Sequence, residues 1–136
     1  MAPKHTFPKE EKLCYRRSFD LLFAHRHTFK CGRLWVIYLF DLPPELVTAP
    51  QMAAFSAPKR NFKRAVDRNL LKRRLREAYR LHKHPFVEQL VQQDHNAALL
   101  IKYLPRRIES FQVIEQDVRS VIERLQHKLE RHHARS

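Results

Sequence analysis

The densest set of side chains able to do chemistry is KRAVDRNLLKRRLREAYRLHK, residues 63 to 83, where nine of twenty-one residues are Lys or Arg. A guanidinium group binds phosphate oxygens through paired hydrogen bonds and can also stack on exposed bases. Only Asp67 and Glu77 supply negative charge within this stretch. Because like charges repel along a helix, the composition indicates a polyanionic ligand that restores the balance.

Helical periodicity divides the same stretch into two faces. At 100° per residue, Leu71, Leu75 and Ala78 fall within about 60° of one another, which predicts a buried stripe. The opposite face is a cationic strip that contains Lys72, Arg73, Arg76, Arg80 and Lys83, together with Asn69. Arg74 projects toward the apolar side. The Arg-rich strip favours RNA or DNA over a lipid surface, because the chain also has strands for this helix to cover.

Catalytic and metal-binding patterns are weak by comparison. The acidic residues are scattered, without the carboxylate cluster of a metal-dependent nuclease. The nearest histidine pairs are His25 with His27 and His132 with His133. Neither pair has the i, i+4 spacing of a helical zinc motif, so no dedicated metal site is predicted. Acid–base catalysis by histidines is a weaker alternative, and we expect His82 and His84 to add positive charge near phosphate.

Length and charge limit the remaining possibilities. A chain of 136 residues with 43% hydrophobic content can bury the core of one domain. The net charge is +13, of which residues 59 to 83 supply +9. The sequence has no apolar run of about 20 residues and no secretory signal, which predicts a cytoplasmic protein without a membrane segment. Cys14 and Cys31 are expected to be reduced thiols.

Apolar periodicity and proline positions predict the other elements. We expect helices at 16 to 26 and 110 to 131, and strands at 33 to 40, 51 to 57 and 97 to 104. The alanines and leucines of the last two segments leave helix open as an alternative. This order predicts an α+β fold, an α/β sandwich in which a small sheet is covered by helices.

The motif AVDRNLLKRRLREAYR resembles the signature of the bacterial ribonuclease P protein subunit, approximately Ala-Val-x-Arg-Asn-Arg-x-Lys-Arg-x-x-Arg-Glu. The residues in register are Ala65, Val66, Arg68, Asn69, Lys72, Arg73, Arg76 and Glu77. FPKEEKLCYRRSFDLLF and GRLWVIYLF are similar to the family's opening pattern and first strand, so the resemblance extends over residues 7 to 125. Leu70 and Lys63 depart from the pattern, which usually has Arg and Gly at these positions.

The resemblance implies a fold similar to the second domain of ribosomal protein S5, with a left-handed βαβ crossover that presents the basic helix. It also implies one domain over residues 1 to 136, with a core at about 7 to 125 and a basic tail at 126 to 136. In this family a partner RNA uses magnesium to free the mature 5′ end of tRNA. The polypeptide is then expected to hold no catalytic residue and no cofactor of its own.

Two RNA-binding surfaces follow from the resemblance. Contacts with the catalytic RNA are implied for Lys59, Arg60, Arg68, Asn69, Lys72, Arg73, Arg76 and Arg80. Phe19, Phe23 and Tyr38 match positions that contact the 5′ leader of precursor tRNA, in a cleft beside the sheet. For the two phenylalanines, packing in the core is an equal alternative. The implied partners are catalytic RNA and precursor tRNA, with no obligatory protein partner.

Two other functions remain open for the sequence. A ribosomal or chaperone-like RNA-binding protein would have much the same composition, and only the spacing of the signature argues against it. A protein-only nuclease would cleave without added RNA, which the scattered acidic residues make unexpected.

Overall fold

The computed structural model describes residues 8–13, 15–25 and 27–135. Four α-helices, four strands and two short 3-10 helices lie within this part of the chain. The helices are α1 (Arg16–His25), α2 (Ala65–His82), α3 (His84–Gln92) and α4 (Phe111–Arg135). The strands are β1 (His27–Cys31), β2 (Leu34–Phe40), β3 (Gln51–Ser56) and β4 (Ala97–Tyr103). The 3-10 helices are η1 (Lys9–Glu11) and η2 (Pro44–Leu46).

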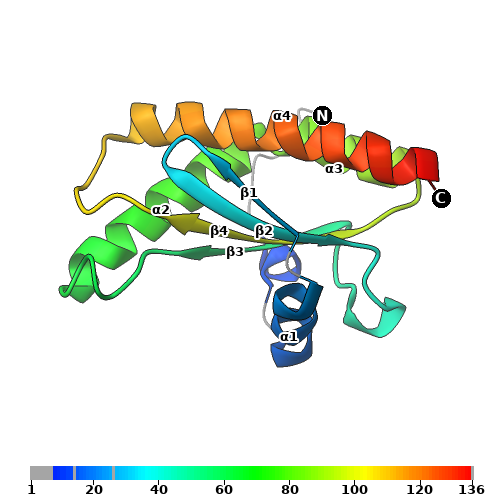
Figure 1. The fold of residues 1–136 in the computed structure, drawn as a ribbon, viewed down its shortest axis with the longest axis horizontal. Coiled ribbons are helices and arrows are strands. Elements are labelled where there is room, and N and C mark those ends of the chain that lie inside the picture. The colour runs from blue at the N-terminus through cyan, green and yellow to red at the C-terminus, as the bar shows by residue number, and fades with distance from the viewer. Residues whose placement is uncertain (1–7, 14, 26, 136) are drawn as a thin grey trace.

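The strands form one sheet in the order β1-β2-β4-β3. β1 and β2 form an antiparallel hairpin, β2 pairs antiparallel with β4, and β3 pairs parallel with β4. The connection between the parallel strands runs through α2 and α3, which gives the β-α-β crossover that the resemblance implies. Helices α2, α3 and α4 lie over one face of the sheet and α1 lies over the other (Figure 1). The predicted α+β sandwich is confirmed.

One strand and one α-helix were not predicted. β1 carries polar residues at exposed positions and buries only Phe29 and Cys31, so its apolar signal is short. α3 contains Pro85 close after the end of the basic helix, and a proline at such a position is typical of a break between elements. The structure places this proline in the first turn of α3, where its missing N–H has no helical partner to lose. Both segments left open as helices, at 51 to 57 and 97 to 104, are strands.

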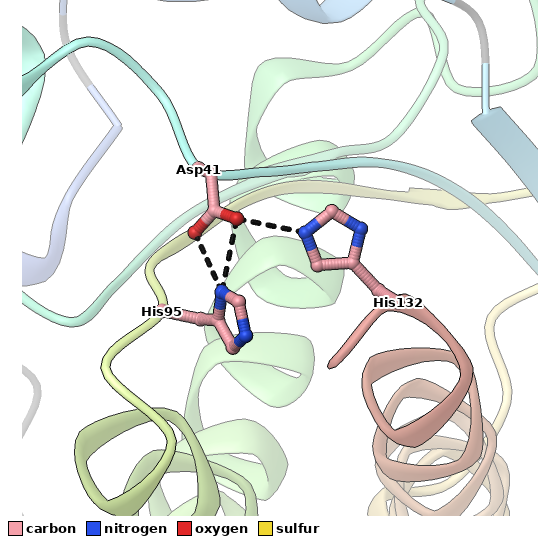
Figure 2. Close-up of side chains that lie close together, drawn as sticks. All are labelled: Asp41, His95 and His132. Atoms are coloured by element: carbon pink, nitrogen blue, oxygen red, sulfur yellow. Dashed lines mark hydrogen bonds and ion pairs between the residues drawn. The ribbon is translucent and has the colours of Figure 1, made fainter. Parts of the chain in front are cut away.

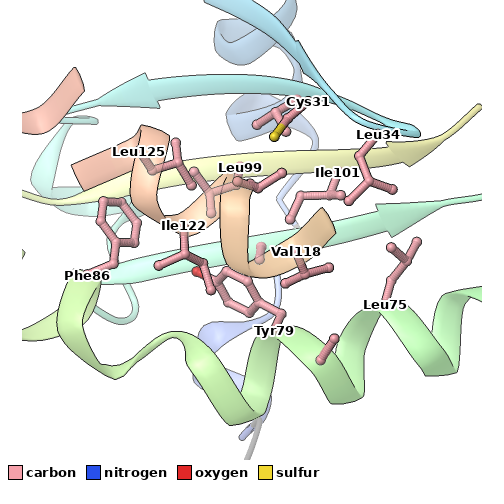
Figure 3. Packing of buried hydrophobic residues seen from close by; sticks show 14 of the residues in the cluster. Cys31, Leu34, Leu75, Tyr79, Phe86, Leu99, Ile101, Val118, Ile122 and Leu125 are labelled. Atoms are coloured by element: carbon pink, nitrogen blue, oxygen red, sulfur yellow. The ribbon is translucent and has the colours of Figure 1, made fainter. Parts of the chain in front are cut away.

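The main core lies between the sheet and the three helices on its α2–α3–α4 face (Figure 3). Leu71, Leu75 and Ala78 are fully buried there, as the helical periodicity predicts. The Tyr79 side chain is also fully buried, and its hydroxyl donates a 2.6 Å hydrogen bond to Oε1 of Gln51. This bond joins α2 to the edge strand β3, so the exposed face of α2 has a fixed orientation relative to the sheet.

A smaller cluster lies between the sheet and α1. The two clusters are separated by the alternation of side chains along the strands. In β2, Leu34, Val36 and Phe40 belong to the main core, whereas Ile37 and Leu39 pack against the smaller cluster. The face toward which each β2 side chain points is therefore settled along the whole strand.

Gly32 forms the tight turn between β1 and β2 at a φ of +57°. A Cβ atom at this position would lie 2.4 Å from Oδ1 of Asp117 in α4. The close approach lets Asp117 accept hydrogen bonds from the Arg33 backbone N–H at 3.3 Å and from its guanidinium at 3.1 Å. The only glycine of the chain thus joins the hairpin to α4.

The last helix ends four residues beyond its predicted end at residue 131. α4 continues to Arg135, through most of the region assigned to a basic tail at 126 to 136. Leu129 is fully buried in the main core, so the core extends beyond residue 125. Of the two cysteines, Cys31 is a buried free thiol as predicted, and Cys14 lies outside the described residues. None of the described helices is both long enough and apolar enough to cross a membrane.

Candidate nucleic-acid interface

The exposed face of α2 carries most of the predicted cationic strip. Asn69, Arg73 and Arg76 are exposed, and Lys72 is half-buried beside them. Among the described residues, neither Arg73 nor Arg76 has an acidic partner within ion-pair distance. Two guanidinium groups of one helix face are therefore available to an external anion.

Arg80 and Arg68 belong to the same surface but make bonds within the chain. Arg80 forms an ion pair with Glu77 one turn away. The hydrogen bond from Arg80 lowers the pKa of the Glu77 carboxyl group, and burial, which raises it, has the smaller effect. The Arg68 guanidinium donates to the backbone oxygens of Phe62 at 2.7 Å and of Lys63 at 3.0 Å. Arg68 thus fixes the loop that leads into α2.

Lys59 and Arg60 are both exposed in the turn between β3 and α2. A hydrogen bond from the Asn61 backbone N–H to the Pro58 oxygen, 3.2 Å long, closes this turn. The structure therefore brings the two residues to the N-terminal end of the α2 strip. All eight residues predicted to contact catalytic RNA lie on α2 or on the turn before it.

Two predictions about the basic helix have opposite outcomes. Arg74 donates a hydrogen bond to the backbone oxygen of Glu109, on the side of α2 that faces the start of α4, so its predicted position is confirmed. Lys83, predicted on the cationic strip, is instead 3% exposed. It lies at the joint between α2 and α3 and forms an ion pair with Glu11. Lys83 keeps helical dihedral angles, and its N–H donates to the Tyr79 carbonyl at 2.9 Å, so the helical phase extends to this residue. The prediction failed because α3 begins at His84 and Glu11 of η1 lies against the joint, which buries the Lys83 side chain.

His82 also has a structural contact. Its Nε2 lies 2.9 Å from a carboxylate oxygen of Glu115 in α4. This contact joins α2 to α4 and directs the imidazole away from the exposed strip.

A second surface lies on the α1 face of the sheet. Phe23, Thr28, Trp35 and Ile37 line an open groove there. The Phe23 side chain is 47% exposed and the Trp35 side chain is 41% exposed, which is unusual for large aromatic residues. Phe19 is half-buried and packs against the smaller cluster. Of the two phenylalanines for which packing in the core was an alternative to leader binding, Phe19 therefore packs in the core and Phe23 does not.

Basic side chains flank Trp35 within the sheet. In the strand pairing, Trp35 is opposite Lys30 of β1 on one side and opposite Lys102 of β4 on the other. Because directly paired residues point to the same face, both lysines lie on the α1 face with the indole ring. An exposed ring between two cations can stack on a base while the lysines neutralise nearby phosphates.

Tyr38 lies on the opposite face of the sheet from Phe19 and Phe23. Its ring is 5.4 Å from the Phe40 ring, and Lys128 of α4 lies 5.7 Å from its centroid. Burial raises the pKa of the Tyr38 hydroxyl, an effect partly offset by nearby Arg124 and Arg131. The prediction that the three aromatic rings line one cleft is therefore wrong.

Trp35 is not among the residues predicted to bind the leader, although the sequence contains a signal for it. Strict alternation along GRLWVIYLF places Trp35 and Tyr38 on different faces of the strand. The sequence does not reveal which face α1 covers, so alternation alone cannot decide which ring joins Phe23.

The fold and its surface define the class: a small basic α+β protein with an Arg-rich helix face and an exposed aromatic groove, both suited to a polyanionic ligand. The family model for ribonuclease P matches residues 7–126. The chain therefore belongs to the ribonuclease P family, whose members are protein components of a tRNA-processing ribonucleoprotein.

Individual proteins agree with this assignment. The ribonuclease P protein component of Porphyromonas gingivalis W83 is 29% identical over 123 residues, which covers 90% of this chain and 88% of the relative. The component from Chlorobaculum tepidum is 30% identical over 128 residues, covering 89% and 83% of the two chains. The structure of the Staphylococcus aureus RNase P protein has the same fold, with a TM-score of 0.63 at 17% identity, over 83% of this chain and 93% of that chain.

Proposed function

We propose that this protein subunit of ribonuclease P binds the catalytic RNA through the α2 strip and the 5′ leader of precursor tRNA through the groove on the α1 face. The observation that carries the proposal is the position of Trp35, exposed between Lys30 and Lys102 on a sheet face that also presents Phe23. Stacking on such rings tolerates any base, as a general processing enzyme requires.

The α2 strip has different chemistry from the groove. Its exposed groups are guanidinium, ammonium and amide groups, which bind phosphate oxygens and recognise folded RNA by shape. Lys59 and Arg60, in the turn that precedes α2, extend this cationic surface past the N-terminal end of the helix. We therefore assign the strip to the catalytic RNA and the groove to the unpaired leader.

We infer that cleavage is carried out by the RNA, with magnesium bound in the RNA partner. In the described part of the chain, one group of side chains has the geometry to hold a metal ion, Asp41 with His95 and His132. It contains a single carboxylate, whereas magnesium prefers an octahedral set of oxygen ligands. The role of this chain in the reaction is then to bind and position the two RNAs.

The strip is tested by the salt dependence of binding to ribonuclease P RNA. Log affinity falls as log salt rises. This fall should become shallower by about one unit of slope in Arg73→Ala, and by about one further unit in the Arg73→Ala/Arg76→Ala double variant, because each Arg neutralises about one phosphate. Filter binding or fluorescence anisotropy at several salt concentrations measures this slope.

Arg74→Ala is the matched control for this measurement. It removes the same charge from the same helix, but its guanidinium is bonded to the Glu109 carbonyl rather than presented on the strip. Its slope should remain close to that of the wild type. An unchanged slope in the double variant, or an equal decrease in Arg74→Ala, would contradict the assignment of the strip.

A further inference from the structure

Three side chains with metal-binding atoms meet at one end of the sheet, where β2 ends and the segment before β4 begins (Figure 2). Nδ1 of His95 lies 3.0 and 2.9 Å from the two carboxylate oxygens of Asp41. Nε2 of His132 lies 2.7 Å from one of these oxygens. One ligand atom from each residue can be chosen so that all three lie within 4.8 Å of one another.

The backbone holds Asp41 in an unusual conformation at this point. Asp41 follows directly after β2 and has a φ of +60°, which costs about 1 to 2 kcal/mol for a residue with a Cβ atom. Its N–H donates to the Asn96 carbonyl at 2.8 Å, and the Leu42 N–H donates to the Asn96 side chain at 2.9 Å. The carboxylate is thus directed toward the two imidazoles by a fixed turn.

Both histidine rings are also held in place. His132 packs against Phe40 with ring centroids 5.1 Å apart, and the His95 and His132 rings meet edge to face at 5.1 Å. The His95 side chain is only 8% exposed, whereas Asp41 and His132 are 42% and 37% exposed. One side of the cluster is therefore packed and the other is open to solvent.

The donor atoms indicate the class of ion. Two imidazole nitrogens and one carboxylate oxygen are ligands that zinc and similar divalent transition metals prefer. With metal–ligand distances of about 2.0 to 2.2 Å, tetrahedral ligands lie about 3.4 Å apart. The Asp41–histidine separations of 2.7 to 3.0 Å are those of hydrogen bonds, so each pair must move apart by about half an ångström to admit an ion. The two imidazole nitrogens, which lie within 4.8 Å of each other, must reach the same ligand spacing.

We propose that Asp41, His95 and His132 form a binding site for one divalent transition metal ion of the zinc type. His95 ligates through Nδ1 and His132 through Nε2, and the fourth position opens to solvent. The Nε2 of His95 lies 2.9 Å from Nδ1 of His133. With Nδ1 on the metal, His95 carries its proton on Nε2 and donates it to His133, which fixes the tautomer that ligation needs.

The site joins three segments that are distant in sequence. Asp41 directly follows β2, His95 precedes β4, and His132 lies in the last turns of α4. A bound ion would therefore fasten the C-terminal end of α4 to the sheet and raise the thermal stability of the folded chain. The sequence predicted no metal site because only histidines close in sequence were compared. Asp41, His95 and His132 are distant in sequence, so that comparison could not find them.

The experiment is a zinc titration of the full-length, metal-free chain by calorimetry, with the same titration by Co²⁺ followed by visible absorption. We expect one ion per chain at this site and a rise in melting temperature with zinc concentration. Asp41→Asn and His132→Ala should each weaken zinc binding by at least about 10- to 100-fold, because each removes a direct ligand. His133→Ala should weaken it by about 10-fold through loss of the orienting hydrogen bond.

His127→Ala is the matched control, since His127 is exposed on the same helix and outside the cluster. Its zinc affinity should equal that of the wild type. If Asp41→Asn and His132→Ala both melt as folded proteins and bind zinc as tightly as the wild type, the ion lies elsewhere and the proposal is overturned. Failure of the wild-type chain to bind zinc or to be stabilised by it would overturn it equally.

Discussion

The Trp35→Ala variant is expected to bind leader-bearing precursor tRNA about 1 to 3 kcal/mol more weakly than the wild type, with little change in its binding of mature tRNA. The physical reason is the loss of base stacking on a ring that is 41% exposed and lies between two lysines of neighbouring strands. Phe23→Ala should show the same selective loss, because its ring faces the same groove. Equilibrium binding of both tRNAs to the complex of chain and catalytic RNA measures the difference.

Tyr38→Ala is the control on the same strand. It removes an aromatic ring three residues from Trp35, but from the opposite face of the sheet. Thermal melts come first, because loss of half-buried aromatic surface also lowers stability. If Tyr38→Ala loses the preference for the leader and Trp35→Ala retains it, the leader lies against the α4 face and our assignment of the groove is wrong.

Lys83→Met should lower the free energy of unfolding by about 3 to 5 kcal/mol. The Lys83 side chain is 4% exposed and that of Glu11 is 13% exposed, so the substitution leaves a nearly buried carboxylate without its ammonium partner. The pair also joins η1 to the joint between α2 and α3. Burial raises the pKa of the Tyr79 hydroxyl, and the negative charge of Glu11 raises it further. Urea unfolding gives the difference.

The double variant Glu11→Leu/Lys83→Met distinguishes two effects: the loss of attraction between the two charges, and the cost of the unpaired Glu11 carboxylate that remains in Lys83→Met. Because both charges are removed, it should recover most of the stability lost in Lys83→Met. Glu45→Gln is the exposed control, since its pair with Arg17 is 57% and 62% exposed and should contribute no more than about 1 kcal/mol. Equal losses in Lys83→Met and Glu45→Gln would show that burial of the Lys83 pair has no special effect.

Local patterns predicted most of the elements and the position of one of the two surfaces proposed to bind RNA. The cationic strip is a property of a single helix, so its 3.6-residue period is visible in the sequence, and Leu71 and Leu75 are buried where that period places them. The prediction failed at Lys83, where a second helix begins immediately after the first. Helical phase could not reveal this joint.

The features that the sequence could not reveal depend on contacts between distant segments. Alternation separates Trp35 from Tyr38, but only the packing of α1 decides which face contains the groove. Asp41 and His132 are 91 residues apart, and no spacing rule brings them together. Such contacts arise from the arrangement of whole elements, and local propensity carries no information about them.

Reconstituted cleavage distinguishes a subunit that assists a catalytic RNA from a nuclease that acts alone. Precursor tRNA is incubated at low magnesium with ribonuclease P RNA alone, with the chain alone, and with both, and release of the 5′ leader is followed. We expect that the chain accelerates cleavage by the RNA, that the chain alone releases no leader, and that the Arg73→Ala/Arg76→Ala variant requires a higher protein concentration for the same rate. Cleavage by the chain without RNA, or an unchanged rate when the wild-type chain is added, would show that this protein does not assist a catalytic RNA.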